Sequence, residues 1–197
     1  MHINNAYKYL SSDDLFDSLF PINIQQLSEQ HWTPLEVARI AAQFLGPDAE
    51  AKVIDIGAGA GKFCIAGCYF STATFTGIEQ RKNFVQAGNK VAAQLGLEKM
   101  KLIHGNFMDI DISAYTGIYF YNSFHENIIP AHSLDDKVER SEELFDLYTE
   151  ALHTKLKGMP AGTRLATYWL SMSEVPTGYK LHEAHFNNRL KLWIKIA

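Results

Sequence analysis

The sequence predicts an α/β fold with a seven-stranded, mostly parallel sheet, a C-terminal antiparallel hairpin and helices on both faces. One reason is that short apolar runs alternate with helical segments from residue 33 onward, a pattern typical of parallel strands joined by helices. Another is a glycine-rich turn between the first run and its helix, as in nucleotide-binding βαβ units. A third is a pair of strand-like runs around Asn187 and Asn188, which indicates a hairpin.

Length, charge and composition narrow the class of protein. The 197 residues suffice for one domain with a full core. The net charge of -4 argues against a broad nucleic-acid surface. No run approaches the ~20 apolar residues of a membrane span, and residues 1–5 lack a signal-peptide pattern. We therefore expect a cytoplasmic protein with no membrane partner. Cys64 and Cys68, four residues apart, are expected on a buried helix face rather than in a disulfide.

The N-terminal part is predicted to hold short helices. Residues 1–32 are expected to form an extension with a helix near 12–19, and residues 33–197 the domain itself. The next helix begins with Thr33 as its N-cap and Pro34 in its first turn, and Glu36 completes a capping box. Gly46 ends this helix.

Strands and helices then alternate along the chain. The apolar runs and helical patterns predict strands at 52–56, 73–78, 100–104, 117–121 and 163–169, and helices at 61–70, 80–95 and 135–157. The hairpin comprises 179–186, a turn at Asn187-Asn188, and a strand with apolar residues at alternate positions: Leu190, Leu192, Ile194 and Ile196. Residues 171–177 are too few, and too rich in turn formers, for a helix.

The glycine-rich turn carries the most specific motif. The pattern is D-x-G-x-G-x-G, with Asp55, Gly57, Gly59 and Gly61 at its fixed positions. The dinucleotide spacing G-x-G-x-x-G fails, because the third glycine would fall at Lys62 or Cys64. Glu79 ends the next apolar run, 18 residues past Gly61.

This motif resembles motif I of the class I S-adenosyl-L-methionine (SAM) methyltransferases, and the resemblance covers about residues 33–197. It implies SAM as the cofactor. Asp55 would balance the cationic end of the methionine moiety, the helix after the glycines would meet its carboxylate, and Glu79 would accept both ribose hydroxyls. The implied cofactor site also includes Gly57, Ala58, Gly59, Gly61, Gln80, Asn106, Phe107 and Thr33.

Two of these residues, Asn106 and Thr33, have alternative interpretations. Asn106 would accept a hydrogen bond from the adenine amino group, beside an apolar Phe107; Asn106 could instead be a turn residue, and Asp109 competes for the role. Thr33 and Pro34 would close over the methionine end of SAM; alternatively, Thr33 only caps the helix that follows it.

The segment after the fourth predicted strand is where the family places substrate-facing groups. It reads Tyr121-Asn122-Ser123-Phe124 and lacks the prolines of the adenine-N6 and glutamine-N5 enzymes. It resembles more the Asn-Asn-Phe segment of the non-SET histone lysine methyltransferases, although their basic tail is missing. We expect Asn122, Tyr121 and Phe124 to be the catalytic residues, lining an apolar pocket that desolvates an amine. His125 and Glu126 could act together in the site, as the proton acceptor and the acid that orients it, or they could lie in a surface loop.

The sequence thus predicts a SAM-dependent methyltransferase that N-methylates a protein lysine or a small molecule, with nucleic acid less favoured as the acceptor. A non-catalytic SAM-binding interaction domain and a nicotinamide-dependent oxidoreductase are the alternatives. No metal is expected: His182 and His185 are one residue short of the zinc motif and should face opposite ways on a strand.

Overall fold

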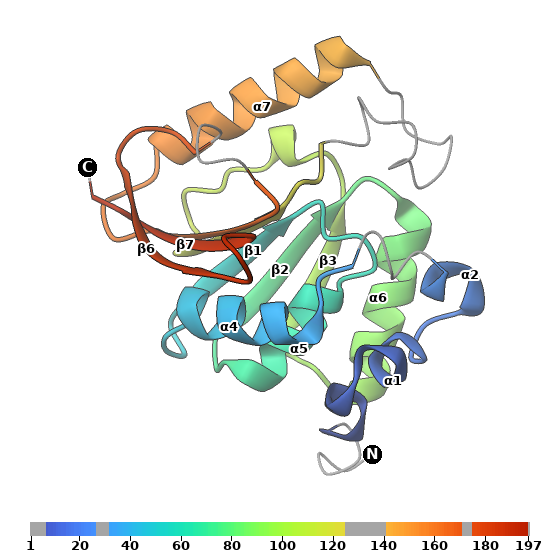
Figure 1. Ribbon diagram of the computed structural model, residues 1–197. Helices are drawn as coiled ribbons and strands as arrows, with labels where there is room; N and C mark the ends of the chain where they lie inside the picture. The colour runs from blue at the N-terminus through green and yellow to red at the C-terminus, as the bar shows by residue number, and fades with distance from the viewer. Residues whose placement is uncertain (1–6, 27–31, 125–140, 171–174, 197) are drawn as a thin grey trace.

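A single sheet of seven strands forms the centre of the computed structural model, which describes residues 7–26, 32–124, 141–170 and 175–196 (Figure 1). The strand order is β3-β2-β1-β4-β5-β7-β6. Neighbours from β3 to β5 pair in parallel, whereas β7 is antiparallel to both β5 and β6. The predicted mixed sheet is confirmed. Its strands are β1 (Lys52–Ile56), β2 (Thr74–Glu79), β3 (Met100–His104), β4 (Gly117–Tyr121), β5 (Arg164–Tyr168), β6 (Tyr179–His185) and β7 (Leu190–Lys195).

Helices cover both faces of this sheet, as predicted. α4, α5 and α6 lie on one face, and α7 lies on the other (Figure 1). Three short helices precede them. The helices are η2 (Tyr7–Ser11), α1 (Asp13–Asp17), α2 (Ile22–Gln25), α4 (Leu35–Leu45), α5 (Lys62–Phe70), α6 (Lys82–Leu95), η3 (Phe107–Asp109) and α7 (Glu142–Lys157). The part of the α7 prediction before residue 141 lies outside the described residues.

Alternation along the central strands produces two apolar cores. Val53 of β1 and Tyr119 of β4 face the first core, which lies beneath α4, α5 and α6. Ile54 and Ile118, their neighbours in sequence, face the second core beneath α7. A strand buried on both faces reads as a continuous apolar run, which is why β1 and β4 were recognisable from sequence.

The predicted capping box at α4 is wrong. Pro34, not Thr33, occupies the N-cap position, and no side chain of the cap itself bonds the helix. The carboxylate of Asp13 instead accepts a hydrogen bond from the backbone N–H of Leu35 at 3.0 Å. Glu36 binds the guanidinium of Arg39 one turn later. The cap comes from a distant segment, which local spacing could not reveal.

The same Asp13 takes part in a buried charged cluster that joins α1 to α5. The ammonium of Lys62, at the start of α5, lies 2.6 Å from Asp13 Oδ1 and 2.7 Å from Asp17 Oδ1. It also stands 5.5 Å from the ring centroids of Phe16 and Trp32. We call Lys62, Asp13 and Asp17 the Lys62 cluster. It fixes the N-terminal segment beside the glycine turn that precedes α5.

The C-terminal hairpin differs from expectation in which side chains are buried and in the directions in which its two histidines point. In β7 the predicted alternation fails, because Lys191, Trp193 and Lys195 are buried together with Leu190 and Leu192. β7 is an inner strand with β5 and β6 on its two sides, and its side chains on both faces of the sheet are buried or partly buried.

In β6 the pairing register shifts between Leu181 and Glu183, which is a β-bulge at His182. His182 Nε2 and His185 Nε2 both approach the Glu183 carboxylate, at 3.5 and 3.1 Å. The two imidazoles therefore do not face opposite ways as predicted, because the extra residue of a bulge interrupts the alternation of side chains.

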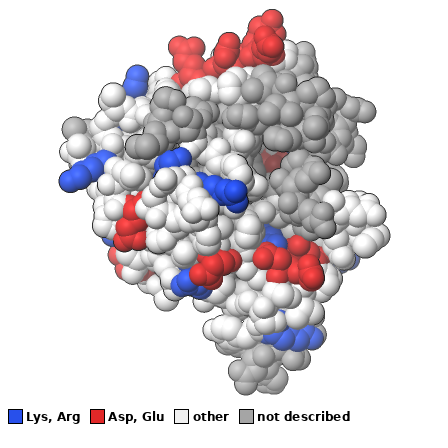
Figure 2. Space-filling model, viewed as in Figure 1, with Lys and Arg blue, Asp and Glu red and all other residues white. Residues whose placement is uncertain are grey.

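The outer surface carries charges of both signs. Figure 2 shows acidic side chains gathered over α7 at the top of the molecule, with basic and acidic groups interspersed below. The first turn of α7 contributes Glu142 and Glu143. None of the helices in the described ranges is long and apolar enough to cross a membrane.

Candidate functional site

The turn between β1 and α5 is shaped by three glycines in the left-handed region. Gly57, Gly59 and Gly61 have φ of 76°, 56° and 82°, a conformation that costs most other residues about 1–2 kcal/mol. A Cβ on Gly57 would lie 2.4 Å from the Ser123 side chain, whereas one on Gly59 would meet nothing within 4 Å. The turn is thus packed against the loop after β4 at Gly57 and open at Gly59.

The turn is held in place by β2. The N–H groups of Gly57 and Ala58 both donate to the carbonyl of Ile78, each at 3.0 Å. Gly61 occupies the N-cap of α5, and no side chain caps that helix end. The positive end of the α5 dipole therefore faces the same edge of the sheet as the open turn.

Glu79 ends β2 with its carboxylate directed at this turn. Its Oε2 accepts from Gly59 N–H at 3.0 Å, and its Oε1 accepts from Arg81 N–H at 2.8 Å. The Arg81 guanidinium lies 3.6 Å from the same Oε1, and both side chains are buried. Glu79 therefore fixes the backbone at Gly59, a contact that the sequence did not indicate. Gln80 follows, partly buried, and its carbonyl bonds His104 Nε2 at 3.0 Å.

Asp55 is a second buried acid at this edge, 4% exposed. The Cys64 thiol lies 3.8 Å from its Oδ2. Burial raises the pKa of Asp55 to about 8, the Cys64 hydrogen bond opposes this, and the charge of Glu79 raises it further. A cation placed beside Asp55 would restore its ionised form.

Thr33 lies behind the same region rather than on a helix cap. Its hydroxyl is buried and 2.9 Å from the Tyr119 hydroxyl on β4. Asp55 lies opposite Tyr119 in the register of β1 and β4, so Thr33, Tyr119 and Asp55 are close together. The structure brings Thr33 next to the first core, close to the acid predicted to bind the methionine moiety.

Asn106 and Phe107 follow β3 and are engaged with α7. Asn106 Oδ1 accepts from Met108 N–H at 3.0 Å and caps η3, and its Nδ2 donates to the Tyr148 hydroxyl at 3.0 Å. The Phe107 ring stacks on Phe124 with centroids 5.0 Å apart. Both rings are buried in the second core, so Phe124 has little exposed surface with which to contact an acceptor.

The end of β4 places Tyr121 and Asn122 beside the glycine turn. Asn122 has φ of 43°, and its Oδ1 is buried with no hydrogen-bond partner among the described residues. Ser123 Oγ donates to the carbonyl of Ile56 at 2.9 Å, which ties this loop to the end of β1. The ring of Tyr121 packs edge-on against Tyr168, with centroids 4.8 Å apart.

Burial, followed by the neighbouring Tyr168, raises the pKa of Tyr121 to about 12. Tyr121 is therefore a protonated hydrogen-bonding group at neutral pH and not a base. His125 and Glu126 lie outside the described residues.

The carboxyl ends of β1, β2 and β4 thus gather most of the predicted site, and two features were missed. Ser123 fills the space that Gly57 leaves open, and only the tertiary contact reveals it. The Lys62 cluster was missed because its acids lie more than forty residues away in sequence. Within the described ranges, no three His, Cys, Asp or Glu side chains form a metal-binding group.

Comparisons with known proteins agree with this geometry. Residues 47–147 match a family model described as a methyltransferase domain, which is about half of the chain. No curated protein matches the sequence.

Solved structures share the fold. An RNA methyltransferase from Salinibacter ruber, in complex with S-adenosyl-L-homocysteine, superposes with a TM-score of 0.56 at 18% identity, covering 82% of this chain and 90% of its own. TrmN from Thermus thermophilus gives 0.60 at 14% identity, over 87% of this chain and 51% of its own. The mitomycin 7-O-methyltransferase MmcR gives 0.59 at 15% identity, over 97% and 60%. This chain thus spans only about half to three fifths of the last two.

The matched domain contains the glycine turn, both buried acids and the β4 loop, and the sheet has the order of the class I enzymes. The chain therefore belongs to the methyltransferase-domain family, in its class I, SAM-dependent type.

Proposed function

We propose that residues 33–197 form a SAM-dependent N-methyltransferase domain, with residues 1–32 as its extension, that acts on an amine of a small molecule or a protein lysine. The observation that carries the proposal is the buried, unpartnered Oδ1 of Asn122, at the edge of the sheet that holds the glycine turn. A buried carbonyl oxygen without a donor is costly. An acceptor that brings an N–H to this point would satisfy it.

The residues present fit SAM. The left-handed turn at Gly59 is open to a ligand, and the uncapped start of α5 suits a carboxylate. Asp55 suits the ammonium group, and Glu79, held by Gly59 and Arg81, suits the ribose hydroxyls. Thr33, Ala58, Gly57, Gly61, Gln80, Asn106 and Phe107 complete the proposed surroundings.

When bound, SAM would supply a sulfonium methyl group whose carbon the acceptor nitrogen can attack in line with the breaking C–S bond, with S-adenosylhomocysteine as the leaving group. The chain's own part is alignment, water exclusion and control of the proton on nitrogen. Asn122 Oδ1 would hold one N–H of the acceptor, which directs the nitrogen lone pair. Tyr121, backed by Tyr168 and by the buried Phe124, would provide an apolar wall. Such a wall favours the neutral amine, because burial lowers the pKa of an ammonium group.

The test begins with cofactor binding. Calorimetry should show binding of SAM and S-adenosylhomocysteine to the wild type. Glu79→Ala should weaken it by about 1.5–3 kcal/mol, as for loss of a charge-assisted hydrogen bond. Glu79→Gln removes the charge but keeps one carbonyl acceptor for Gly59 N–H. It therefore shows whether any loss of SAM affinity comes from the missing charge or from a disturbed glycine turn. Unchanged affinity in Glu79→Ala would contradict the cofactor assignment.

The second part tests Asn122. Asn122→Gly removes the amide and suits the left-handed backbone at this position. We expect reduced methyl transfer to an acceptor from a cell lysate with tritiated SAM, with SAM affinity and melting temperature unchanged. If label transfer is undiminished, Asn122 does not contact the acceptor. If the variant unfolds, its role is structural.

A further inference from the structure

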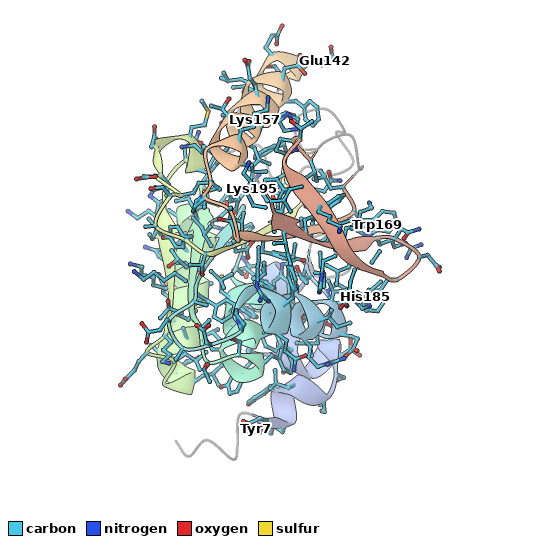
Figure 3. The ribbon with its side chains drawn as sticks, turned by 90° about the vertical axis from the view of Figure 1, so that its left-hand side faces the viewer. Tyr7, Glu142, Lys157, Trp169, His185 and Lys195 are labelled. Carbon is cyan, nitrogen blue, oxygen red and sulfur yellow. The ribbon has the colours of Figure 1, made fainter. Side chains whose placement is uncertain are left out.

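Trp169, which follows β5, is an exposed aromatic residue held in a strained conformation. Its side chain is 49% exposed, and its φ is 58°, which is a rare value for a bulky residue. Its N–H donates to the carbonyl of Arg189 at 2.9 Å, so the strain is imposed by pairing with the start of β7. Figure 3 shows Trp169 at the turn end of the hairpin, with Lys195 at the other end.

The guanidinium of Arg189 lies over this indole. Its Cζ is 4.3 Å from the centroid of the Trp169 ring, which is the distance of a cation–π contact. An arginine in such a contact can still donate its N–H groups to an oxyanion. The Arg189 side chain is exposed. Among the residues that the structure describes, no carboxylate forms an ion pair with it.

Lys191 provides a second cation beside Leu170, the residue that follows Trp169. Its Cα lies opposite Thr167 in the sheet register, yet its Nζ donates to the carbonyl of Leu170 at 2.6 Å. The side chain therefore runs along β5 toward the carboxyl edge of the sheet. Lys191 is only 8% exposed. The described residues supply one acceptor for its three N–H groups and no carboxylate for its charge, although buried charges are normally paired.

We propose that Arg189, Lys191 and Trp169 form a subsite for an anionic group, a carboxylate or a phosphate, carried by a small acceptor molecule. This rests on the proposed function, which places the acceptor nitrogen at Asn122. Two uncompensated cations at one end of β5 and β7 favour an anion. The contact of Arg189 with Trp169 holds the guanidinium at the end of β5, and its planar fork of donors suits either oxyanion. The buried position of Lys191 favours a narrow group entering the site.

The sheet topology relates this subsite to the proposed reacting centre. β4, β5 and β7 are neighbours, and Asn122 and Arg189 flank the same edge because β7 runs antiparallel. Two interstrand spacings place their backbones about 10 Å apart. An acceptor of this class would therefore reach across the end of β5, from its nitrogen at Asn122 to its anionic group at β7.

The anion subsite can be tested without knowing the acceptor. Inorganic phosphate and benzoate are titrated separately into the labelled full chain, with chloride at equal ionic strength as the reference. The Trp169 indole and Arg189 side-chain signals are followed by NMR. We expect saturable shifts of both signals with at least one anion. Arg189→Gln or Lys191→Gln should weaken binding about tenfold to a hundredfold, as expected for loss of a charge-assisted contact.

Arg39→Gln is the matched control, because Arg39 is an exposed arginine paired with Glu36 on α4, outside the site. It should bind both anions like the wild type. Absence of a saturable shift with either anion, or an equal shift in Arg189→Gln, would overturn the subsite.

A transfer assay then examines the link to the reaction. With tritiated SAM and the small-molecule fraction of a lysate, labelled product should bind an anion exchanger, and Arg189→Gln should reduce labelling with SAM affinity unchanged. Phosphatase treatment distinguishes a phosphate from a carboxylate. Product that passes the exchanger, or label confined to protein, would overturn the anionic small acceptor. If the wild type does not bind SAM at all, the proposed function itself is refuted.

Discussion

The Lys62 cluster allows a quantitative prediction about how the N-terminal segment is held. Lys62→Met removes the ammonium group while keeping a side chain of similar length against Phe16 and Trp32. The side chains of Lys62 and Asp17 are 5% and 9% exposed, so the substitution leaves a buried carboxylate unpaired. Breaking such a pair costs about 3–5 kcal/mol. The half-exposed Asp13 adds less than about 1 kcal/mol.

At about 2–4 °C per kcal/mol for a chain of this size, the melting temperature should fall by about 6–20 °C. Urea unfolding of the wild type, Lys62→Met, Asp17→Asn and the double variant measures the coupling. The double variant should lose less than the sum of the two single losses. The exposed Lys90 of α6, in Lys90→Met, serves as the control, with an expected change within about 0.5 kcal/mol. A loss below about 1 kcal/mol in Lys62→Met, or additivity within about 0.5 kcal/mol, would refute the reasoning.

Three further predictions concern the site and its supports. Gly57→Ala should lower the melting temperature and SAM affinity, because φ is 76° and the new Cβ would lie 2.4 Å from Ser123; Ser123→Gly in that background should restore only part of the loss, since the backbone strain persists. In the native state Asp55 keeps its proton up to about pH 8, whereas in the unfolded chain it loses that proton near pH 4. The free energy of unfolding of the wild type should therefore fall between pH 4 and pH 8, relative to that of Asp55→Asn. Urea unfolding at a series of pH values measures this difference. Gly88→Ala in α6 should destabilise the protein in thermal melts despite a helix-propensity gain of about 1 kcal/mol, because its Cβ would lie 2.3 Å from the Ala60 carbonyl; a higher melting temperature would contradict this.

Local sequence predicted the strands well where turn-forming residues follow an apolar run. The bounds of β3 and β4 match their apolar runs, because turn-forming residues end each run in the sequence itself. The same logic failed for β7, whose buried Lys191 and Lys195 depend on neighbouring strands and on partners such as the carbonyl of Leu170. The α4 cap failed for a similar reason, since Asp13 is supplied from a separate helix.

The candidate site divides in the same way. The glycine spacing predicted a tight turn, and the left-handed φ of all three glycines agrees with it. The unpartnered Oδ1 of Asn122 could not be predicted, since an asparagine in a loop normally bonds its own backbone. Whether it does so depends on how Ser123 joins the end of β1. Residue types thus indicate the chemistry, and tertiary contacts decide which atoms remain available.

The bulge at His182 has a consequence for how the sheet ends. β6 is an edge strand, largely exposed along its length, and such an edge is a template for pairing with a strand of another chain. An incoming strand would meet a hydrogen-bond ladder interrupted between Leu181 and Glu183. It would also meet the charges of Lys180 and Glu183. The irregularity that brings the two imidazoles onto one carboxylate therefore also protects this edge against aggregation by sheet extension.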